Sequence, residues 1–112
     1  MHILPKSADL RPVEAIRAAH PDIPYIMISR VACDHESEET VARRDVIYES
    51  YRRAVADGDR NVYFIDGQSI FRGIYENACT VDAVHPNDMG FALMADAIGN
   101  ELKRALTQYL FY

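Results

Sequence analysis

The chain alternates two short apolar runs with three segments of helical periodicity, and this order constrains its fold more than any other feature. The apolar runs are residues 25–29 (YIMIS) and 61–65 (NVYFI). Each run is bounded by turn-forming residues, which is typical of a strand that is covered on both faces. Strands that alternate with helices indicate a parallel sheet with helices packed against it. We therefore expect an α/β fold in which both strands are buried.

The first helix is expected over residues 10–20. Asp9 is placed to cap it, because a carboxylate accepts hydrogen bonds from the free N–H groups of a first turn. Pro12 is tolerated in that turn. Residues 21–24 (PDIP) end the helix, because proline cannot continue one. Residues 1–8 then form an N-terminal tail.

The second helix is expected to follow a polar loop at residues 30–36, with Asp34 or Ser37 as its cap, and to end at residues 57–59 (DGD). Its predicted inward stripe consists of Val41, Ile47, Tyr48, Tyr51, Ala54 and Val55. The opposite face carries Arg43, Arg44, Arg52 and Arg53. Acidic residues are interleaved with these arginines, which favours a solvated face over an anion-binding site.

The last helix is expected to begin at residues 86–88 (PND), where Asn87 or Asp88 can cap it, and to run to about Tyr109. Its predicted buried face consists of Phe91, Met94, Ala95, Ile98, Leu102, Ala105, Leu106 and Tyr109. A short helix over residues 70–76 is expected before it. Two strands alone make a poor sheet, so we expect the chain to be part of a larger α/β domain.

The composition excludes several classes of protein. The net charge of −5 disfavours a general nucleic-acid or anionic-membrane surface, because both partners need a basic face. No apolar run approaches the ~20 residues of a membrane-spanning helix, and residues 1–5 lack the pattern of a signal peptide. Cys33 and Cys79 are too few for a disulfide framework or a zinc knuckle, so two structural thiols are expected. No cofactor is implied.

One polar segment stands out before the last helix, residues 82–90 (DAVHPNDMG). Pro86 stiffens the backbone there, so His85 is held next to the N-terminus of a helix. The positive end of the helix dipole favours a neutral imidazole, which can accept a proton. Asp82 can accept a hydrogen bond from Nδ1 of that ring, which would orient it and stabilise its protonated form. Gly90 allows the first helical turn to pack closely. His85 and Asp82 are therefore the candidate acid–base pair.

This segment, with the helix that follows it, resembles the last sequence block of the SGNH (GDSL-type) hydrolase family. The apolar runs also fit the order of elements in that family, and the resemblance covers residues 9–112, about the second half of a complete domain. It implies a flavodoxin-like, three-layer α/β/α fold, with this chain as the C-terminal part. It also implies hydrolysis of a small-molecule ester or an acylated carbohydrate, with His85 as general base and Asp82 as its orienting partner.

The family's nucleophile is the serine of a Gly-Asp-Ser motif near its N-terminus. Its oxyanion hole also uses a glycine of a second block and an asparagine of a Gly-x-Asn-Asp block. None of these strings occurs in this chain. Ser29 follows the first strand and Ser69 the second, but neither has the glycine-lined turn that exposes a nucleophile, so turn or capping roles are favoured. We therefore expect this chain alone to be inactive.

The main alternative is a non-catalytic α/β binding or structural module that self-associates. A zinc site formed by His85, Asp82 and Asp88 is less favoured, because no second histidine lies at ligand spacing, so no metal is expected. A Cys79–His85 pair is less favoured than a buried inert thiol. A partial domain exposes strand edges, which favours a homo-oligomer or association with a missing N-terminal segment.

Overall fold

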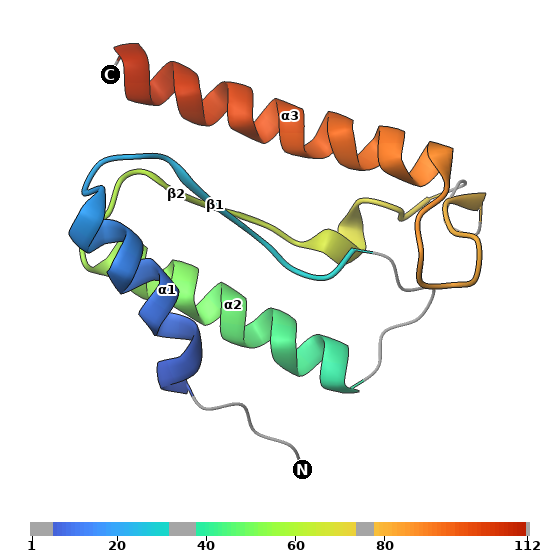
Figure 1. Ribbon diagram of the computed structural model, residues 1–112, viewed down its shortest axis with the longest axis horizontal. Helices are drawn as coiled ribbons and strands as arrows, with labels where there is room; N and C mark the ends of the chain where they lie inside the picture. The colour runs from blue at the N-terminus through green and yellow to red at the C-terminus, as the bar shows by residue number, and fades with distance from the viewer. Residues whose placement is uncertain (1–5, 32–37, 74–77, 112) are drawn as a thin grey trace.

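The computed structural model describes residues 6–31, 38–73 and 78–111. Its elements in chain order are α1 (Lys6–Ala19), β1 (Tyr25–Ile28), α2 (Glu38–Ala56), β2 (Val62–Ile65), the 3₁₀ helix η1 (Gly67–Ser69) and α3 (Asp88–Phe111). The strands are parallel, with Tyr25 opposite Val62 and Ile28 opposite Ile65. Figure 1 shows α3 on one side of this sheet and α1 and α2 on the other. This arrangement confirms the predicted three-layer α/β/α fold.

The amino ends of the two strands are tied to α1 by Arg17. Its Nε donates to Oδ2 of Asp59 over 2.6 Å, and the same guanidinium donates to the carbonyls of Ile23 at 2.6 Å and Asn61 at 3.1 Å. The Arg17 and Asp59 side chains are only 16% and 15% exposed, so solvent screens this ion pair less than a surface pair. The contacts lock the segments that precede both strands against the end of α1.

The main core lies between the sheet and the two helices α1 and α2. Its buried members are Met27, Ala54 and Val62, and the side chains packed around them are Val13, Tyr25, Ile47, Tyr51 and Phe64. The expectation that both strands are fully buried is wrong in part, because Met27 is the one buried residue of β1 and only the first two residues of β2 are buried. The predicted inward stripe of α2 is likewise narrower, because Tyr48 and Val55 remain 47% exposed.

Two predictions about the helices are wrong. The first helix begins at Lys6 and not at residue 10, so Asp9 lies within α1 and part of the predicted tail is helical. Residues 70–73 are not helical, and residues 74–77 of that predicted helix lie outside the described residues. The chain forms η1 instead, because the Asp66 side chain accepts a hydrogen bond from the Gln68 N–H and caps that single turn.

The apolar face of α3 is covered only in part. Ala105 is fully buried and Met94 and Ile98 are half-buried, as predicted, whereas Phe91, Ala95, Leu102, Leu106 and Tyr109 are exposed. Leu110 and Phe111 add to this exposed apolar surface. The two described strands are too narrow to cover so wide a face. Within the described residues, no helix combines the length and apolar character needed to cross a bilayer.

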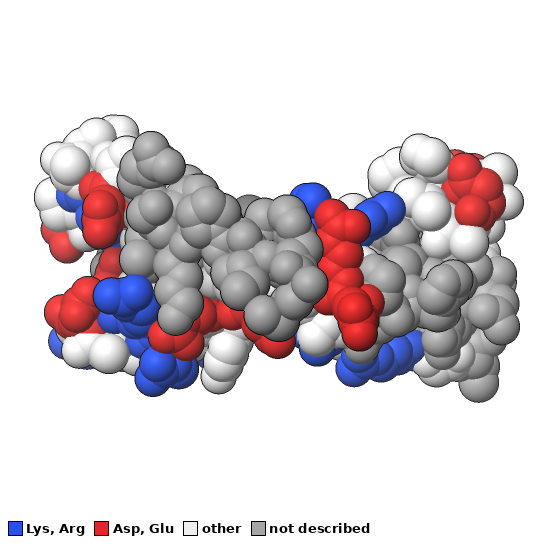
Figure 2. Space-filling model, turned by 90° about the horizontal axis from the view of Figure 1, so that it is seen from below, with Lys and Arg blue, Asp and Glu red and all other residues white. Residues whose placement is uncertain are grey.

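The outer surface of α2 carries charges of both signs. Arg43 pairs with Glu39 at 2.7 Å and Arg52 pairs with Glu49 at 2.8 Å, each within one helical turn. On the face of the molecule shown in Figure 2, acidic and basic side chains lie interleaved over the described residues. These pairs fit the prediction of a solvated helix face. Arg44 departs from it, because its side chain is 22% exposed and its Nη1 lies 3.6 Å from Oδ2 of Asp66.

Candidate active site

The loop that precedes α3 is folded back on itself. Thr80 and Pro86 form an antiparallel bridge, and the Val81 N–H donates to the His85 carbonyl over 2.8 Å. At the tip, Ala83 has a φ of 72°, in the left-handed region that L-residues disfavour. Its N–H donates to Oγ1 of Thr80 over 3.2 Å, which helps to hold this turn. The loop therefore has a defined shape although it is exposed.

Asp82 and His85 form a close pair at the tip of this loop. Nδ1 of His85 lies 2.6 Å from Oδ2 of Asp82. The other carboxylate oxygen, Oδ1, accepts hydrogen bonds from the backbone N–H groups of His85 at 2.7 Å and Val84 at 3.1 Å. The His85 side chain is 76% exposed, so its Nε2 edge is open to a reacting group. The structure thus brings together both residues that the sequence singled out, while their catalytic role stays a prediction.

The hydrogen bonds of this loop fix the charge state of Asp82. Those from His85, first from its backbone N–H and then from its ring, lower the pKa of Asp82 to about 2 from a usual 3.8. The carboxylate is therefore ionised at any pH at which an imidazole can act as a base. An ionised carboxylate stabilises a protonated imidazole without taking its proton. The arrangement suits an orienting partner for a general base.

A pH titration should reveal this pairing. We expect the Asp82 carboxyl signal in ¹³C NMR to titrate with a midpoint near 2. Because the folded pKa lies below the usual value of 3.8, the stabilisation of the loop by ionised Asp82 is complete above about pH 4 and is lost as the pH falls through about 2. In His85→Ala the midpoint should rise only part of the way, because the backbone N–H at position 85 remains. His20→Ala, at an exposed histidine, is the control and should leave it unchanged. A wild-type midpoint near 3.8 would show that the pair does not form.

A second, small hydrophobic core lies beside the base of the loop. Phe71 and Cys79 are buried there, with Val31, Ile70, Leu93 and Met94 packed against them. Gly90 lies at this contact, where a Cβ atom would come within 2.3 Å of the Cys79 carbonyl oxygen. This close approach confirms the expected packing role of Gly90. Cys79 is fully buried, which fits a structural thiol, and Cys33 lies outside the described residues.

The acid–base loop lies at the carboxyl end of the sheet, near η1 (Figure 1). Parallel α/β proteins place their ligands at this edge. Ser29 and Asp66, which follow β1 and β2, are joined here. The Gly67 N–H donates to Oγ of Ser29 over 2.8 Å, and Oγ lies 3.4 Å from Oδ1 of Asp66. Asp66 also forms the ion pair with Arg44, which fits the low exposure of that arginine.

Neither serine at this edge has the setting of a nucleophile. Ser29 is 3% exposed and its hydroxyl is engaged by Gly67 and Asp66. The Ser69 hydroxyl donates to the Asp66 carbonyl over 2.6 Å. Both hydroxyls thus serve the turns that end the strands, as the sequence predicts.

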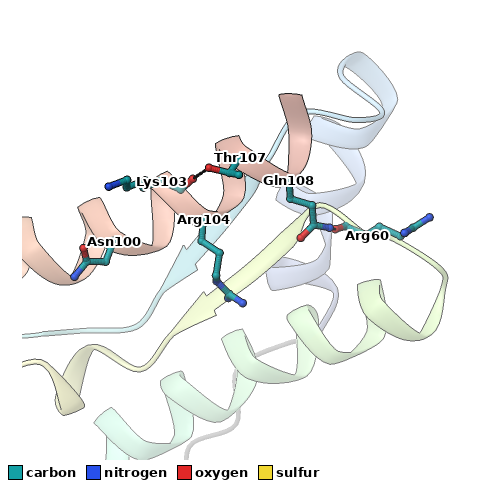
Figure 3. A pocket seen from close by; sticks show the side chains of 6 residues that line it. All are labelled: Arg60, Asn100, Lys103, Arg104, Thr107 and Gln108. Carbon is teal, nitrogen blue, oxygen red and sulfur yellow. Dashed lines mark hydrogen bonds between the residues drawn. The ribbon is translucent and has the colours of Figure 1, made fainter. Parts of the chain in front are cut away.

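A broad pocket lies away from this loop, between α3 and the start of β2 (Figure 3). It is lined by Arg60, Asn100, Lys103, Arg104, Thr107 and Gln108. Gln108 accepts a hydrogen bond from the Tyr63 hydroxyl, and Arg104 pairs with Glu101. The side chains of Arg60 and Lys103 point away from each other (Figure 3). The cations of this pocket therefore do not converge on one ligand.

The candidate zinc ligands are not gathered into a cluster. In the described part of the chain, no three His, Cys, Asp or Glu side chains come together as they would around one metal ion. Asp88, which opens α3, therefore does not join Asp82 and His85 in a ligand set.

The fold and the edge at which the loop lies define the chain as part of a parallel, three-layer α/β protein. A model of the GDSL-like lipase/acylhydrolase family matches residues 6–103, and the chain belongs to that family. Among solved structures, it is similar to the salicylyl-acyltransferase SsfX3 from a tetracycline biosynthetic pathway, with 20% identity and a TM-score of 0.68. This likeness concerns the fold, and it covers 88% of this chain but only 31% of that one. No curated protein sequence matches the chain.

The structure shows three features of this loop, two hydrogen bonds and one backbone conformation, that the sequence analysis missed. They are the hydrogen bond from Ala83 to Thr80, the left-handed turn at Ala83, and a hydrogen bond from the Asn87 side chain to the Ala78 carbonyl. A Thr–x–x–Ala spacing carries no recognisable turn signal. The Asn87 amide is recognised from sequence only as a helix cap, because its second partner depends on how the loop closes.

Proposed function

We propose that the chain supplies the acid–base pair of a serine ester hydrolase of the esterase or acylhydrolase class. His85 is the general base and Asp82 is its orienting partner. The observation that carries the proposal is the 2.6 Å contact between them at the carboxyl end of the sheet, in a member of the lipase/acylhydrolase family. The substrate is a small-molecule ester or an acylated carbohydrate.

The proposed reaction proceeds in two halves. Nε2 of His85 takes the proton of a serine hydroxyl while the serine oxygen attacks the acyl carbon, and the protonated ring then gives this proton to the departing alkoxide oxygen. A water molecule attacks the acyl-serine in the second half, with His85 again taking and returning one proton. Asp82 keeps its negative charge throughout and stabilises the imidazolium in each half.

The nucleophile in this proposal comes from a polypeptide segment outside these residues. Two observations support this part. Ser29 and Ser69 are both held in strand-end turns. The exposed apolar face of α3, at Leu102, Leu106 and Tyr109, offers a surface for the segment or for a second copy. We call the protein that combines this chain with that segment the complete esterase.

The alternative of a non-catalytic, self-associating module draws on the same exposed face. A module without catalytic machinery has no need of a carboxylate bonded to Nδ1 of an exposed histidine. The contact of Asp82 with His85 therefore favours the hydrolase.

The chain by itself should show no ester hydrolysis above that of buffer. Triad members act as a unit, so the loss of one costs about 10⁴ to 10⁶ in turnover. Release of p-nitrophenol from p-nitrophenyl acetate measures this, and a fluorophosphonate probe followed by mass spectrometry should find no labelled serine. Stoichiometric labelling of one serine, lost in His85→Ala, would instead place the nucleophile within the chain. If the genomic sequence upstream encoded no in-frame Gly-Asp-Ser segment, the nucleophile could not come from such a segment of the same protein.

A further inference from the structure

Hydrogen bonds within the loop hold Asp82 and His85 together, but the loop itself needs contacts that fix it to the rest of the fold. Both side chains lie at the exposed tip, where Asp82 is 52% and His85 76% exposed. The loop joins the rest of the fold at its base, where Ala78 and Asn87 lie side by side. The contacts at this base therefore decide in which direction the imidazole faces.

Asn87 makes four hydrogen bonds at the base of the loop, one of which is the bond that its carbonyl accepts from the Phe91 N–H at the start of α3. Its N–H donates to the Cys79 carbonyl over 2.9 Å, and its side-chain Nδ2 donates to the Ala78 carbonyl over 2.7 Å. Its side-chain Oδ1 accepts from the Gly90 N–H over 3.0 Å, which caps α3. One half-buried side-chain amide thus joins the segment that enters the loop, at Ala78, to the helix that follows it, α3.

We propose that Asn87 is a positioning residue for His85, because its side-chain amide fixes the acid–base loop to the N-terminus of α3. The inference rests on the proposed function of the His85–Asp82 pair. The role needs a donor and an acceptor on one short side chain. Serine retains an acceptor for the cap but has no second arm to reach Ala78, and aspartate would set an acceptor against the Ala78 carbonyl.

The test compares Asn87→Ser with the wild-type chain. Asn87→Ser keeps the cap, so α3 should form, whereas the bond to Ala78 is lost. We expect the hydrogen-exchange protection of the Val81 amide, which bonds to His85, to fall at least about tenfold. The Asp82 carboxyl midpoint should move from about 2 toward 3.8. Asn100→Ser, at an exposed position of the same helix, is the matched control and should change neither value.

In the complete esterase, Asn87→Ser should lower kcat by up to about 100-fold with little change in KM, because a base displaced by about 1 Å loses that much rate. Should Asn87→Ser fail to fold, the isosteric Asn87→Asp retains the cap and gives the same Val81 exchange readout.

Two results would overturn the inference, and they differ in what else they overturn. Wild-type values of Val81 protection and Asp82 midpoint in Asn87→Ser would show that Asn87 is only a helix cap, and would leave the proposed function intact. An Asp82 midpoint near 3.8 in the wild-type chain would show that there is no pair to position, and both proposals would fail.

Discussion

Replacing His85 with alanine is expected to lower the kcat of the complete esterase by about 10⁴- to 10⁶-fold. This loss corresponds to about 5 to 8 kcal/mol of transition-state stabilisation. It is large because alanine offers no atom that can take the serine proton, and the serine hydroxyl is a weak nucleophile without a base. KM should change little, because the imidazole acts on the reacting proton and not on the bound ground state. Steady-state hydrolysis of p-nitrophenyl acetate gives both constants.

Two further variants test the same assignment of His85 as the general base. Asp82→Asn preserves the shape of the carboxylate but lacks its charge, so kcat should fall by about 10⁴ through loss of ring orientation and imidazolium stabilisation. His20→Ala removes an exposed histidine beyond α1 and should leave kcat within twofold of the wild type. If His85→Ala kept more than a tenth of the activity, His85 would not be the general base.

The second large effect is expected at Gly67, where β2 passes into η1. A Cβ atom at this position would lie 2.1 Å from the Ser29 carbonyl oxygen and 2.6 Å from that of Arg30. Both are backbone atoms of the segment after β1, so neither can move aside as a flexible side chain would. Gly67→Ala should therefore lower the free energy of unfolding by about 3 kcal/mol, a large part of the stability of a small domain. Urea unfolding followed by circular dichroism measures it.

Gly99→Ala is the matched control for this substitution. Gly99 lies within α3, and a Cβ atom there would meet nothing within 4 Å. Alanine has the better helix propensity, so this variant should gain up to about 1 kcal/mol. The two glycines thus predict opposite signs for the same chemical change. Equal unfolding midpoints for Gly67→Ala and the wild type would refute the close approach of the two strand ends.

Much of the fold follows from local patterns in the sequence. The apolar runs at residues 25–29 and 61–65 predict β1 and β2 to within one residue at either end. The Pro-Asn-Asp string predicts the start of α3, because a cap and the turn after it are made by neighbours in the chain. The Asp82–His85 contact was predictable for the same reason, since three residues separate the partners.

The errors arise where distant residues decide the outcome. Periodicity marks an apolar stripe on α3 but not which part of it is covered, and the two described strands leave Leu102, Leu106 and Tyr109 exposed. The charge pattern of α2 predicts a solvated Arg44, because nothing in that helix reveals the Asp66 carboxylate brought beside it by β2.

By itself, the sequence determined the order of the elements, the parallel α/β class and the pairing of Asp82 with His85. These features depend on side-chain spacing along the chain, which is set by covalent geometry. Only the tertiary structure decided that Gly67 meets the backbone after β1, that Ser29 is held by Gly67, 38 residues away, and that Asn87 binds the Ala78 carbonyl. Such contacts form when packing brings separate segments together, and no local pattern encodes the distance between them.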